Sequence, residues 1–317
     1  MNTTRHTVGP EPAFVAELGG IGTDEFITWY REHRQEIDGQ LTTVGAVRFD
    51  GVQIDSLEGF QQIVDSIASK FLNYVDGNSP RTKLTANVYT STEYDQSRRI
   101  TMHNELSYSA KWPNKLFFTC LEPALSGGET LLADGREILD IMDPAIVRAI
   151  EEKNILYIRN LHSGLGVGPS WQDTFETGDK QEVERYCHAL GISFEWGANA
   201  ALRLLQPSRG IIRHRETKQR VWFNQIDQFH PTQLGEEIYE AMAAMYDSPE
   251  EFPMFVKFGN GEDIPEGMVK DILASIGQVT RAPKWQRNQF LVIDNELVLH
   301  GRNSYAGSRK VLVAMSE

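Results

Sequence analysis

The chain has 317 residues, of which 40% are apolar and 24% are charged, proportions that are ordinary for a soluble globular protein with a full core. Its formal net charge of −13 argues against nucleic acid or an anionic membrane as a partner, although it does not exclude a local basic pocket for a carboxylate. Two cysteines, Cys120 and Cys187, are too few for a disulfide framework or a thiolate-rich metal centre. Because no apolar signal region or membrane-length run is found, we expect a reducing, cytoplasmic location.

The N-terminal part of the chain predicts an arm followed by helices. Residues 1–12 are polar and contain proline, so we expect a loose arm there, and a short helix is expected over Asp24–Asp38. A second helix is expected after Asp55, where Asp55 and Glu58 fit a start that resembles a capping box. Apolar residues then recur at helical spacing over Phe60–Phe71, which predicts packing against the core.

The rest of the chain alternates between predicted strands and predicted helices. Runs rich in Val, Ile, Phe or Tyr predict strands at Lys83–Tyr89, Leu116–Leu121, Ile155–Arg159, Gly210–His214, Val221–Asn224, Phe290–Ile293 and Lys310–Ala314. Helical patterns interrupt them at Arg136–Lys153, Lys180–Leu190, Gln233–Tyr246 and Gly267–Ile276. Strands at both ends of the chain with helical insertions between them indicate a β-rich α+β fold, and they fit poorly with regular βαβ repetition. We expect one elaborated domain over residues 1–317.

The stretch His103-Asn104-Glu105 carries the most informative chemistry when it is considered together with His300. If this stretch lies on a strand, the side chains of His103 and Glu105 project from one face, and both could reach one ion. Two imidazoles and one carboxylate compose the facial triad of non-haem Fe(II) oxygenases, which leaves coordination positions open. For His-x-Glu alone, the ordinary alternative is a core or surface histidine beside an exposed glutamate.

Two downstream residues in recognisable segments favour the metal site. Thr130 follows a Gly-Gly-Glu turn 25 residues after Glu105, and Arg309 follows nine residues after His300. In this order the motifs resemble the taurine dioxygenase (TauD/TfdA) family of Fe(II)/2-oxoglutarate-dependent oxygenases, from about Gly45 to the C-terminus. The resemblance implies a double-stranded β-helix, or jelly-roll, core with helical insertions. It also implies that His103, Glu105 and His300 bind Fe(II), with 2-oxoglutarate and O2 as cosubstrates.

The same resemblance implies that Arg309 and Thr130 hold the distal carboxylate of 2-oxoglutarate. A guanidinium presents a planar pair of donors that matches a carboxylate, which a lysine does not reproduce. Arg302 and Lys310 are nearby alternatives to Arg309, whose ordinary role would be a surface ion pair. For Thr130, the ordinary role would be to form the turn after the two glycines.

Two further segments, Tyr74–Thr82 and Val88–Tyr94, resemble a narrower branch that contains syringomycin-type amino-acid hydroxylases and clavaminate synthase. Glu105 agrees with that branch, whereas taurine dioxygenase itself has aspartate there, so a taurine-like substrate is in question more than the chemistry. The resemblance implies substrate-side roles for Arg81, Tyr89, Thr92 and Glu93. An aromatic stretch that includes Trp222 and Asn224 could line the substrate cavity, but core packing followed by a turn explains it equally well.

The implied function is hydroxylation of an amino acid or amino-acid derivative in natural-product (antibiotic) biosynthesis. Desaturation and epoxidation share such a metal site and stay open, whereas halogenation is disfavoured because the halogenases of the family lack the carboxylate that Glu105 supplies. A zinc- or manganese-dependent hydrolase or isomerase and a non-catalytic small-molecule-binding jelly roll are alternatives from other classes. The expected partner is an amino-acid-like small molecule, free or tethered to a carrier protein, and the oligomeric state stays open.

Overall fold

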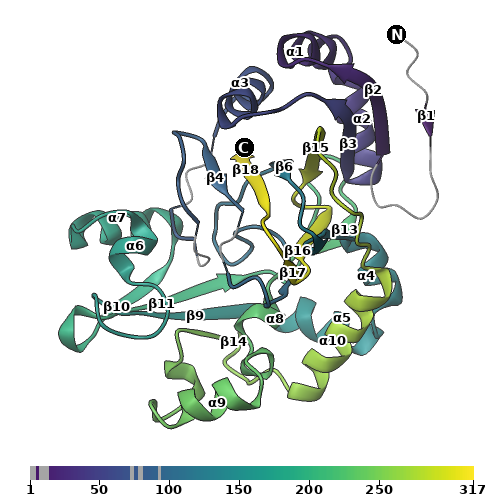
Figure 1. The fold of residues 1–317 in the computed structure, drawn as a ribbon. Coiled ribbons are helices and arrows are strands. Elements are labelled where there is room, and N and C mark those ends of the chain that lie inside the picture. The colour runs from purple at the N-terminus through teal and green to yellow at the C-terminus, as the bar shows by residue number, and fades with distance from the viewer. Residues whose placement is uncertain (1–4, 7–13, 72–74, 78–80, 92–93) are drawn as a thin grey trace.

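The computed structural model describes residues 5–6, 14–71, 75–77, 81–91 and 94–317 (Figure 1). Their fold is mixed α and β, as predicted, and its largest sheet has seven strands. In spatial order these strands are β1 (Arg5–His6), β2 (Phe14–Ile21), β3 (Ala46–Val52), β15 (Gln289–Asp294), β6 (Lys115–Glu122), β18 (Lys310–Ser316) and β4 (Val88–Thr90). Neighbouring strands are antiparallel except for β2 and β3, which run parallel.

A small three-stranded sheet carries both predicted histidine ligands. It has the order β5 (Ile100–His103), β16 (Val298–Arg302) and β8 (Thr130–Asp134). The other strands form a four-stranded sheet and two pairs, namely β10 (Ser193–Trp196), β11 (Leu202–Ser208), β9 (Ile155–Leu161) and β14 (Met254–Phe258), then β12 (Ile211–Arg213) with β13 (Arg220–Trp222), and β7 (Ser126–Gly127) with β17 (Tyr305–Ala306). All pairings in these smaller sheets are antiparallel.

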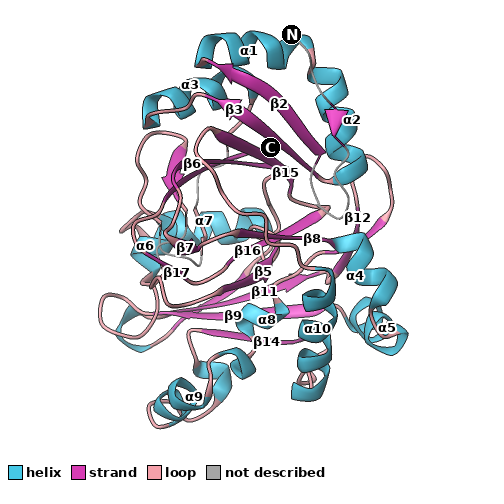
Figure 2. Cartoon of the chain, turned by 45° about the vertical axis from the view of Figure 1, so that its right-hand side comes forward, coloured by secondary structure: helices cyan, strands magenta, loops and turns pink. Residues whose placement is uncertain are grey.

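The seven-stranded sheet separates two apolar layers because successive side chains of a strand point to opposite faces. On one face, Phe117 and Val292 pack into an apolar cluster with residues of three N-terminal helices. Figure 2 shows these helices beside β2 and β3. These helices are α1 (Thr23–Glu32), α2 (Arg34–Val44) and α3 (Leu57–Ile67). On the other face, Phe118 and Leu291 pack into a second cluster that contains Leu299 of β16. The strands that carry the histidines therefore pack against the face of the large sheet that is opposite the N-terminal helices.

The remaining helices lie along the middle and late parts of the chain (Figure 1). They are α4 (Gly135–Ile141), α5 (Pro144–Lys153), α6 (Trp171–Phe175), α7 (Lys180–Leu190), α8 (Ile226–Phe229), α9 (Glu236–Ala243) and α10 (Glu266–Val279). Buried residues of α6 and α7, including Trp171 and Val183, form a third cluster with Leu202 and Leu204 of β11. No helix in the described ranges combines the length and apolar character that crossing a bilayer requires.

The N-terminal predictions needed three corrections. The helix expected over Asp24–Asp38 is divided into α1 and α2 at His33, whose backbone leaves the helical region. The cap of α3 is Ser56 and not Asp55, since the Ser56 hydroxyl accepts a hydrogen bond from the Gly59 N–H at 3.1 Å. Within the expected arm, Arg5–His6 pairs with β2, while residues 1–4 and 7–12 lie outside the described residues.

Two later elements also differ from prediction. The strand expected over Lys83–Tyr89 begins only at Val88, as β4, and Lys83 forms an isolated bridge to Tyr89. The helix expected over Arg136–Lys153 is interrupted before Pro144, because proline lacks an N–H and disfavours helical geometry in the residue before it. The helix predicted over Lys180–Leu190 is confirmed with the same bounds, as α7.

Candidate metal centre and the cavity beside it

His103 and His300 are directly paired across two neighbouring strands. His103 is the last residue of β5, and it lies opposite His300 of β16 in the antiparallel ladder. The two rings are 4.2 Å apart between centroids, and both residues are buried. Gly301 permits this close pairing, because a Cβ there would lie 2.7 Å from the Ile100 carbonyl oxygen of β5. The sheet itself thus brings together two residues that are distant in sequence.

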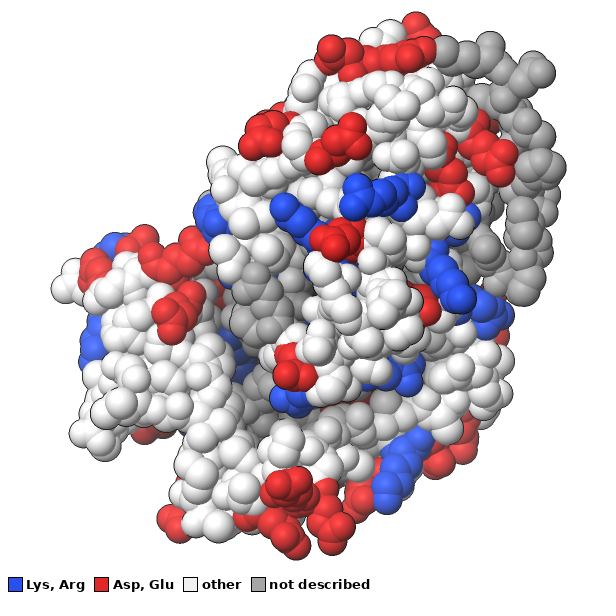
Figure 3. Space-filling model, in the orientation of Figure 1, with Lys and Arg blue, Asp and Glu red and all other residues white. Residues whose placement is uncertain are grey.

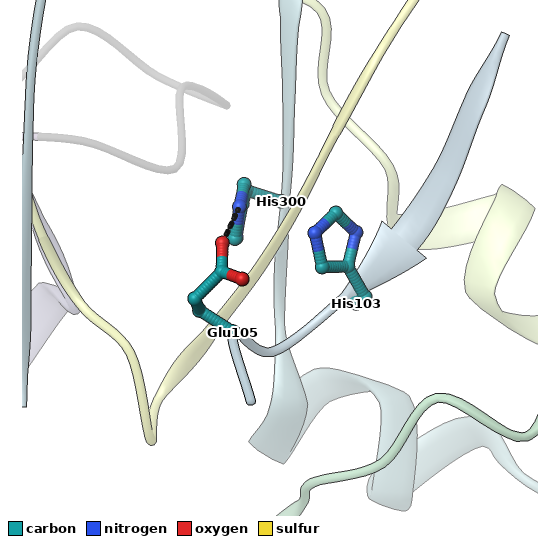
Figure 4. Close-up of side chains that lie close together, drawn as sticks. All are labelled: His103, Glu105 and His300. Carbon is teal, nitrogen blue, oxygen red and sulfur yellow. Dashed lines mark ion pairs between the residues drawn. The ribbon is translucent and has the colours of Figure 1, made fainter. Parts of the chain in front are cut away.

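Glu105 reaches the same point from outside the sheet, so the condition considered for the sequence, that His103 and Glu105 share one strand, does not hold. Strand β5 ends at His103, and the backbone turns at Leu106, which has a positive φ of 55°. The Glu105 carboxylate nevertheless points toward the two rings (Figure 4), and its Oε2 lies 3.7 Å from Nε2 of His300. One potential ligand atom from each of the three residues lies within 4.8 Å of the others, and no other such group is found in the described part of the chain.

The protonation states of these residues suit a divalent metal ion. Nδ1 of His103 lies 2.9 Å from the Thr101 carbonyl oxygen, which can only accept, so Nδ1 carries the proton and Nε2 presents a lone pair. Burial and the neighbouring His300 lower the pKa of His103 to about 3, which keeps this ring neutral. Burial alone would raise the pKa of Glu105, but Arg81 and the two imidazoles outweigh it and hold that pKa well below its usual range. The donor set of two imidazoles and one carboxylate therefore fits Fe(II).

Arg81 makes a buried ion pair with the proposed ligand carboxylate. Its Nη2 lies 2.5 Å from Oε2 of Glu105, and both side chains are less than 5% exposed. The sequence indicated a substrate-side position for Arg81, and the structure places its guanidinium directly against the triad. A positive charge at this point lowers the cost of burying the carboxylate.

Arg309 and Thr130 line the same small cavity as His103 and His300. Arg309 follows β17 in the chain, and its guanidinium donates to the Gly128 carbonyl oxygen at 2.9 Å and to the Ser91 hydroxyl at 3.0 Å. Burial, with a smaller contribution from a neighbouring arginine, lowers the pKa of Arg309 to about 10, so it stays charged at neutral pH. The Thr130 hydroxyl accepts from Nε1 of Trp285 at 2.9 Å, which leaves its own proton to donate elsewhere.

The alternatives to Arg309 have other positions. Arg302 also lines the cavity, but its Nη2 donates to the carbonyl oxygens of Tyr94, Asp95 and Arg98 at 2.9–3.3 Å and so holds that segment. Lys310 is exposed, and its backbone lies opposite that of Glu122 where β18 begins beside β6. Of the three cationic side chains, Arg309 is the one whose contacts orient it within the cavity.

The other predicted substrate residues are not gathered at this cavity. Trp222 is fully buried in the main apolar cluster. Asn224 donates to the Gly210 carbonyl oxygen at 2.9 Å and accepts from the Ile226 N–H at 3.2 Å, so its contacts stabilise the start of α8. Tyr89 is buried in β4, beneath the Lys83 ammonium. Substrate roles for these three residues stay predictions, and Thr92 and Glu93 lie outside the described residues.

Sequence reasoning missed the polar residues that support the site. Asn295 and Gln225 are buried and hydrogen-bond to the backbone of residues 104 and 105, while Ser91 and Trp285 contact Arg309 and Thr130. Asn295 lies five residues before His300 in the same segment, which is the one signal that could have drawn attention to it.

Comparisons with known proteins agree with the motifs. The model of the taurine catabolism dioxygenase TauD, TfdA family matches residues 6–315. Dapdiamide synthesis protein DdaC of Enterobacter agglomerans is 35% identical over 300 residues, which cover 95% of this chain and 89% of that protein. A clavaminate synthase-like protein of Arabidopsis thaliana is 29% identical, with 96% and 91% covered. The structure of an asparagine oxygenase, in complex with Fe(II), 3-hydroxyasparagine and succinate, has a TM-score of 0.54 at 10% identity and covers 92% of this chain and 79% of its own.

The chain belongs to the TauD/TfdA family, as the order of its motifs predicted. Its enzyme class is that of an Fe(II)/2-oxoglutarate-dependent dioxygenase, and the donor set of His103, Glu105 and His300 is chemically suited to that metal.

Proposed function

We propose that this enzyme hydroxylates an aliphatic carbon of an amino acid or amino-acid derivative in natural-product biosynthesis, with Fe(II) held by His103, Glu105 and His300. The observation that carries the proposal is that His103 and His300, which Glu105 joins in the triad, line one cavity together with Arg309 and Thr130. Neither a zinc hydrolase nor a non-catalytic binding protein needs a buried, oriented guanidinium opposite its metal ligands. Bound iron would use O2 as the oxidant and 2-oxoglutarate as the cosubstrate to oxidise an unactivated C–H bond, with one oxygen atom going to the product and the other to succinate, and with carbon dioxide released.

Each residue of the cavity has a defined task in this proposal. Arg309 pairs with the distal carboxylate of 2-oxoglutarate, and the Thr130 hydroxyl donates a second hydrogen bond to the same group. The neutral ring of His103 keeps Nε2 available because Thr101 holds the proton on Nδ1. Phe118 of β6 and Val313 of β18 line the cavity on the side of the seven-stranded sheet, where their apolar side chains would disfavour water beside the metal. A site that lies between two sheets in this way supports a jelly-roll core.

The charge of the cavity favours a substrate that carries a carboxylate. Glu105 is the acidic residue in the triad, whereas Arg81, Arg302 and Arg309 all line the cavity. With a divalent metal ion and the 2-oxoglutarate dianion bound, the formal charges of these groups leave the site net positive. A free α-carboxylate would offset part of this excess, which favours a free amino acid over one that is esterified to a carrier protein.

Two related proteins support an amino-acid-like substrate. The name of DdaC places that protein in dapdiamide synthesis, and the asparagine oxygenase was captured with a hydroxylated amino acid. Desaturation or epoxidation would use the same residues and would differ only in the fate of the substrate radical. Retention of Glu105 disfavours halogenation, because that carboxylate occupies the position that a halide would need.

The test is aerobic incubation of iron-loaded protein with 2-oxoglutarate and a panel of free, peptide-linked and carrier-linked amino acids. We expect one free amino acid or simple derivative to gain one oxygen atom, with stoichiometric succinate, by mass spectrometry. Loss of two hydrogens without oxygen gain would instead establish a desaturase. Coupled oxidation of taurine or an aryloxyacetate, with all amino-acid forms inert, would refute the substrate class. Oxygen-independent turnover supported by zinc would refute the oxygenase.

A further inference from the structure

The third metal ligand leaves the sheet without the support that holds the other two. His103 and His300 are fixed by backbone pairing between β5 and β16, but β5 ends before Glu105. Glu105 is only 2% exposed, so its N–H and carbonyl oxygen need partners other than water. Both partners come from a single side chain.

Asn295 supplies these partners from the turn that connects β15 to β16. Its Oδ1 accepts the Glu105 N–H at 2.7 Å, and its Nδ2 donates to the Glu105 carbonyl oxygen at 3.0 Å. Nδ2 also donates to the Pro113 carbonyl oxygen at 2.9 Å. One carboxamide therefore pairs with both backbone groups of Glu105, much as a residue of a neighbouring strand would pair with them. The side chain thus supplies a ladder-like pair of hydrogen bonds two residues beyond the end of β5.

Other amides reinforce the same connection. The Asn295 carbonyl oxygen accepts from Nδ2 of Asn104 at 2.7 Å, and the Asn104 carbonyl oxygen accepts from Nε2 of Gln225 at 2.7 Å. The turn itself is closed by Asp294, whose Oδ1 accepts the N–H groups of the two residues after Asn295 at 2.9 Å and 3.2 Å. Asn295 thus ties the backbone of Glu105 to a turn that continues directly into β16 and His300.

We propose that Asn295 is a positioning residue for the metal centre, which sets the place of the Glu105 carboxylate relative to His300 and thereby the affinity and geometry of metal binding. This inference rests on the proposed function of the triad as the iron site. Polar partners that orient metal ligands commonly change affinity roughly 10- to 100-fold when they are removed. A residue that served only the fold would reduce stability without a separate effect on the metal.

Asn160 provides a matched control. Its Nδ2 also donates to two backbone carbonyl oxygens, those of Glu250 at 2.8 Å and Phe252 at 2.7 Å, but it lies on β9 in the four-stranded sheet. Asn295→Asp and Asn160→Asp each remove two such donated bonds while keeping the side-chain shape. Asn295→Ser and Asn160→Ser make the same comparison without adding a carboxyl group.

The experiment measures Co(II) binding to each metal-free variant by its d–d absorption, anaerobic Fe(II) affinity, and thermal unfolding of the metal-free protein. Both Asn295 variants should bind metal roughly 10- to 100-fold more weakly than wild type, with altered Co(II) bands. The Asn160 variants should lose stability but keep wild-type affinity and bands. Wild-type metal binding in the Asn295 variants, or loss of their metal-free fold, would overturn the proposal. Glu105→Ala tests the triad assignment separately from the positioning role of Asn295. If this variant binds Co(II) as wild type does, the triad assignment itself fails.

Discussion

Replacement of Arg309 by leucine should weaken 2-oxoglutarate binding while leaving the three metal ligands in place. The guanidinium is largely buried and is oriented by Gly128 and Ser91, so little reorganisation is needed when a carboxylate binds. A charge-assisted hydrogen bond contributes about 1.5–3 kcal/mol, and removing the buried partner of a carboxylate lies toward the upper end of that range. A loss of about 3 kcal/mol corresponds to roughly a 150-fold rise in Kd.

The assay is anaerobic titration of the Fe(II)-loaded protein with 2-oxoglutarate, followed by the visible charge-transfer absorption, with iron content measured in parallel. Arg309→Lys should give an intermediate Kd because it keeps the charge but loses the planar pair of donors. Lys310→Leu is the control, since Lys310 is the exposed neighbour of Arg309. An unchanged Kd in Arg309→Leu at normal iron content would refute the reasoning and redirect the assignment to Arg302.

Three further predictions concern the metal centre and its surroundings. Alanine at His103, Glu105 or His300 should greatly weaken Fe(II) binding and abolish coupled succinate formation; normal iron affinity in all three would eliminate the triad. Gly301→Ala should lower stability by about 1–3 kcal/mol and weaken metal binding, since its Cβ would meet the β5 backbone, and unchanged iron affinity would contradict this. Burial raises the pKa of Asp227 to about 7. The protonated carboxyl group therefore stabilises the folded state fully below the unfolded-state pKa, and this stabilisation is lost as pH rises through about 7. Asp227→Asn should remove this part of the pH dependence of the free energy of unfolding, measured by chemical denaturation.

The residues of the site could be predicted from sequence more readily than the way they are supported. The identities of His103, Glu105 and His300 followed from residue type and motif order, and these residues do converge. The sequence did not show whether one strand carries both members of His-x-Glu, because periodicity cannot reveal where a four-residue strand stops. The structure ends β5 at His103. The role of Asn295 could not be predicted for a related reason. An asparagine in a turn has an ordinary local explanation, and its contact with Glu105 joins residues 190 positions apart.

The fold shows the same contrast between local and tertiary information. Helix α7 was predicted with its exact bounds, since its capping aspartate, amphipathic stripe and terminal glycine are all local signals. The parallel pairing of β2 with β3 was not predicted, because β2 precedes two helices and carries no run that identifies it as a strand. For Trp222 the sequence left a cavity wall and core packing equally open, and the structure places its side chain in the fully buried core.

The site combines two kinds of support with different consequences for mutation. His103, His300 and Thr130 lie on paired strands, where backbone hydrogen bonds set their positions and most side-chain substitutions leave these bonds in place. Glu105 and Arg309 lie outside these strands and are held by contacts that involve side chains, from Asn295 to Glu105 and from Arg309 to Ser91 and Gly128. We therefore expect single substitutions to shift the side chains of Glu105 and Arg309, the proposed metal ligand and the proposed cosubstrate anchor, more easily than the histidine pair. If these two roles hold, metal affinity and 2-oxoglutarate affinity should respond to separate substitutions on a sheet framework that stays the same.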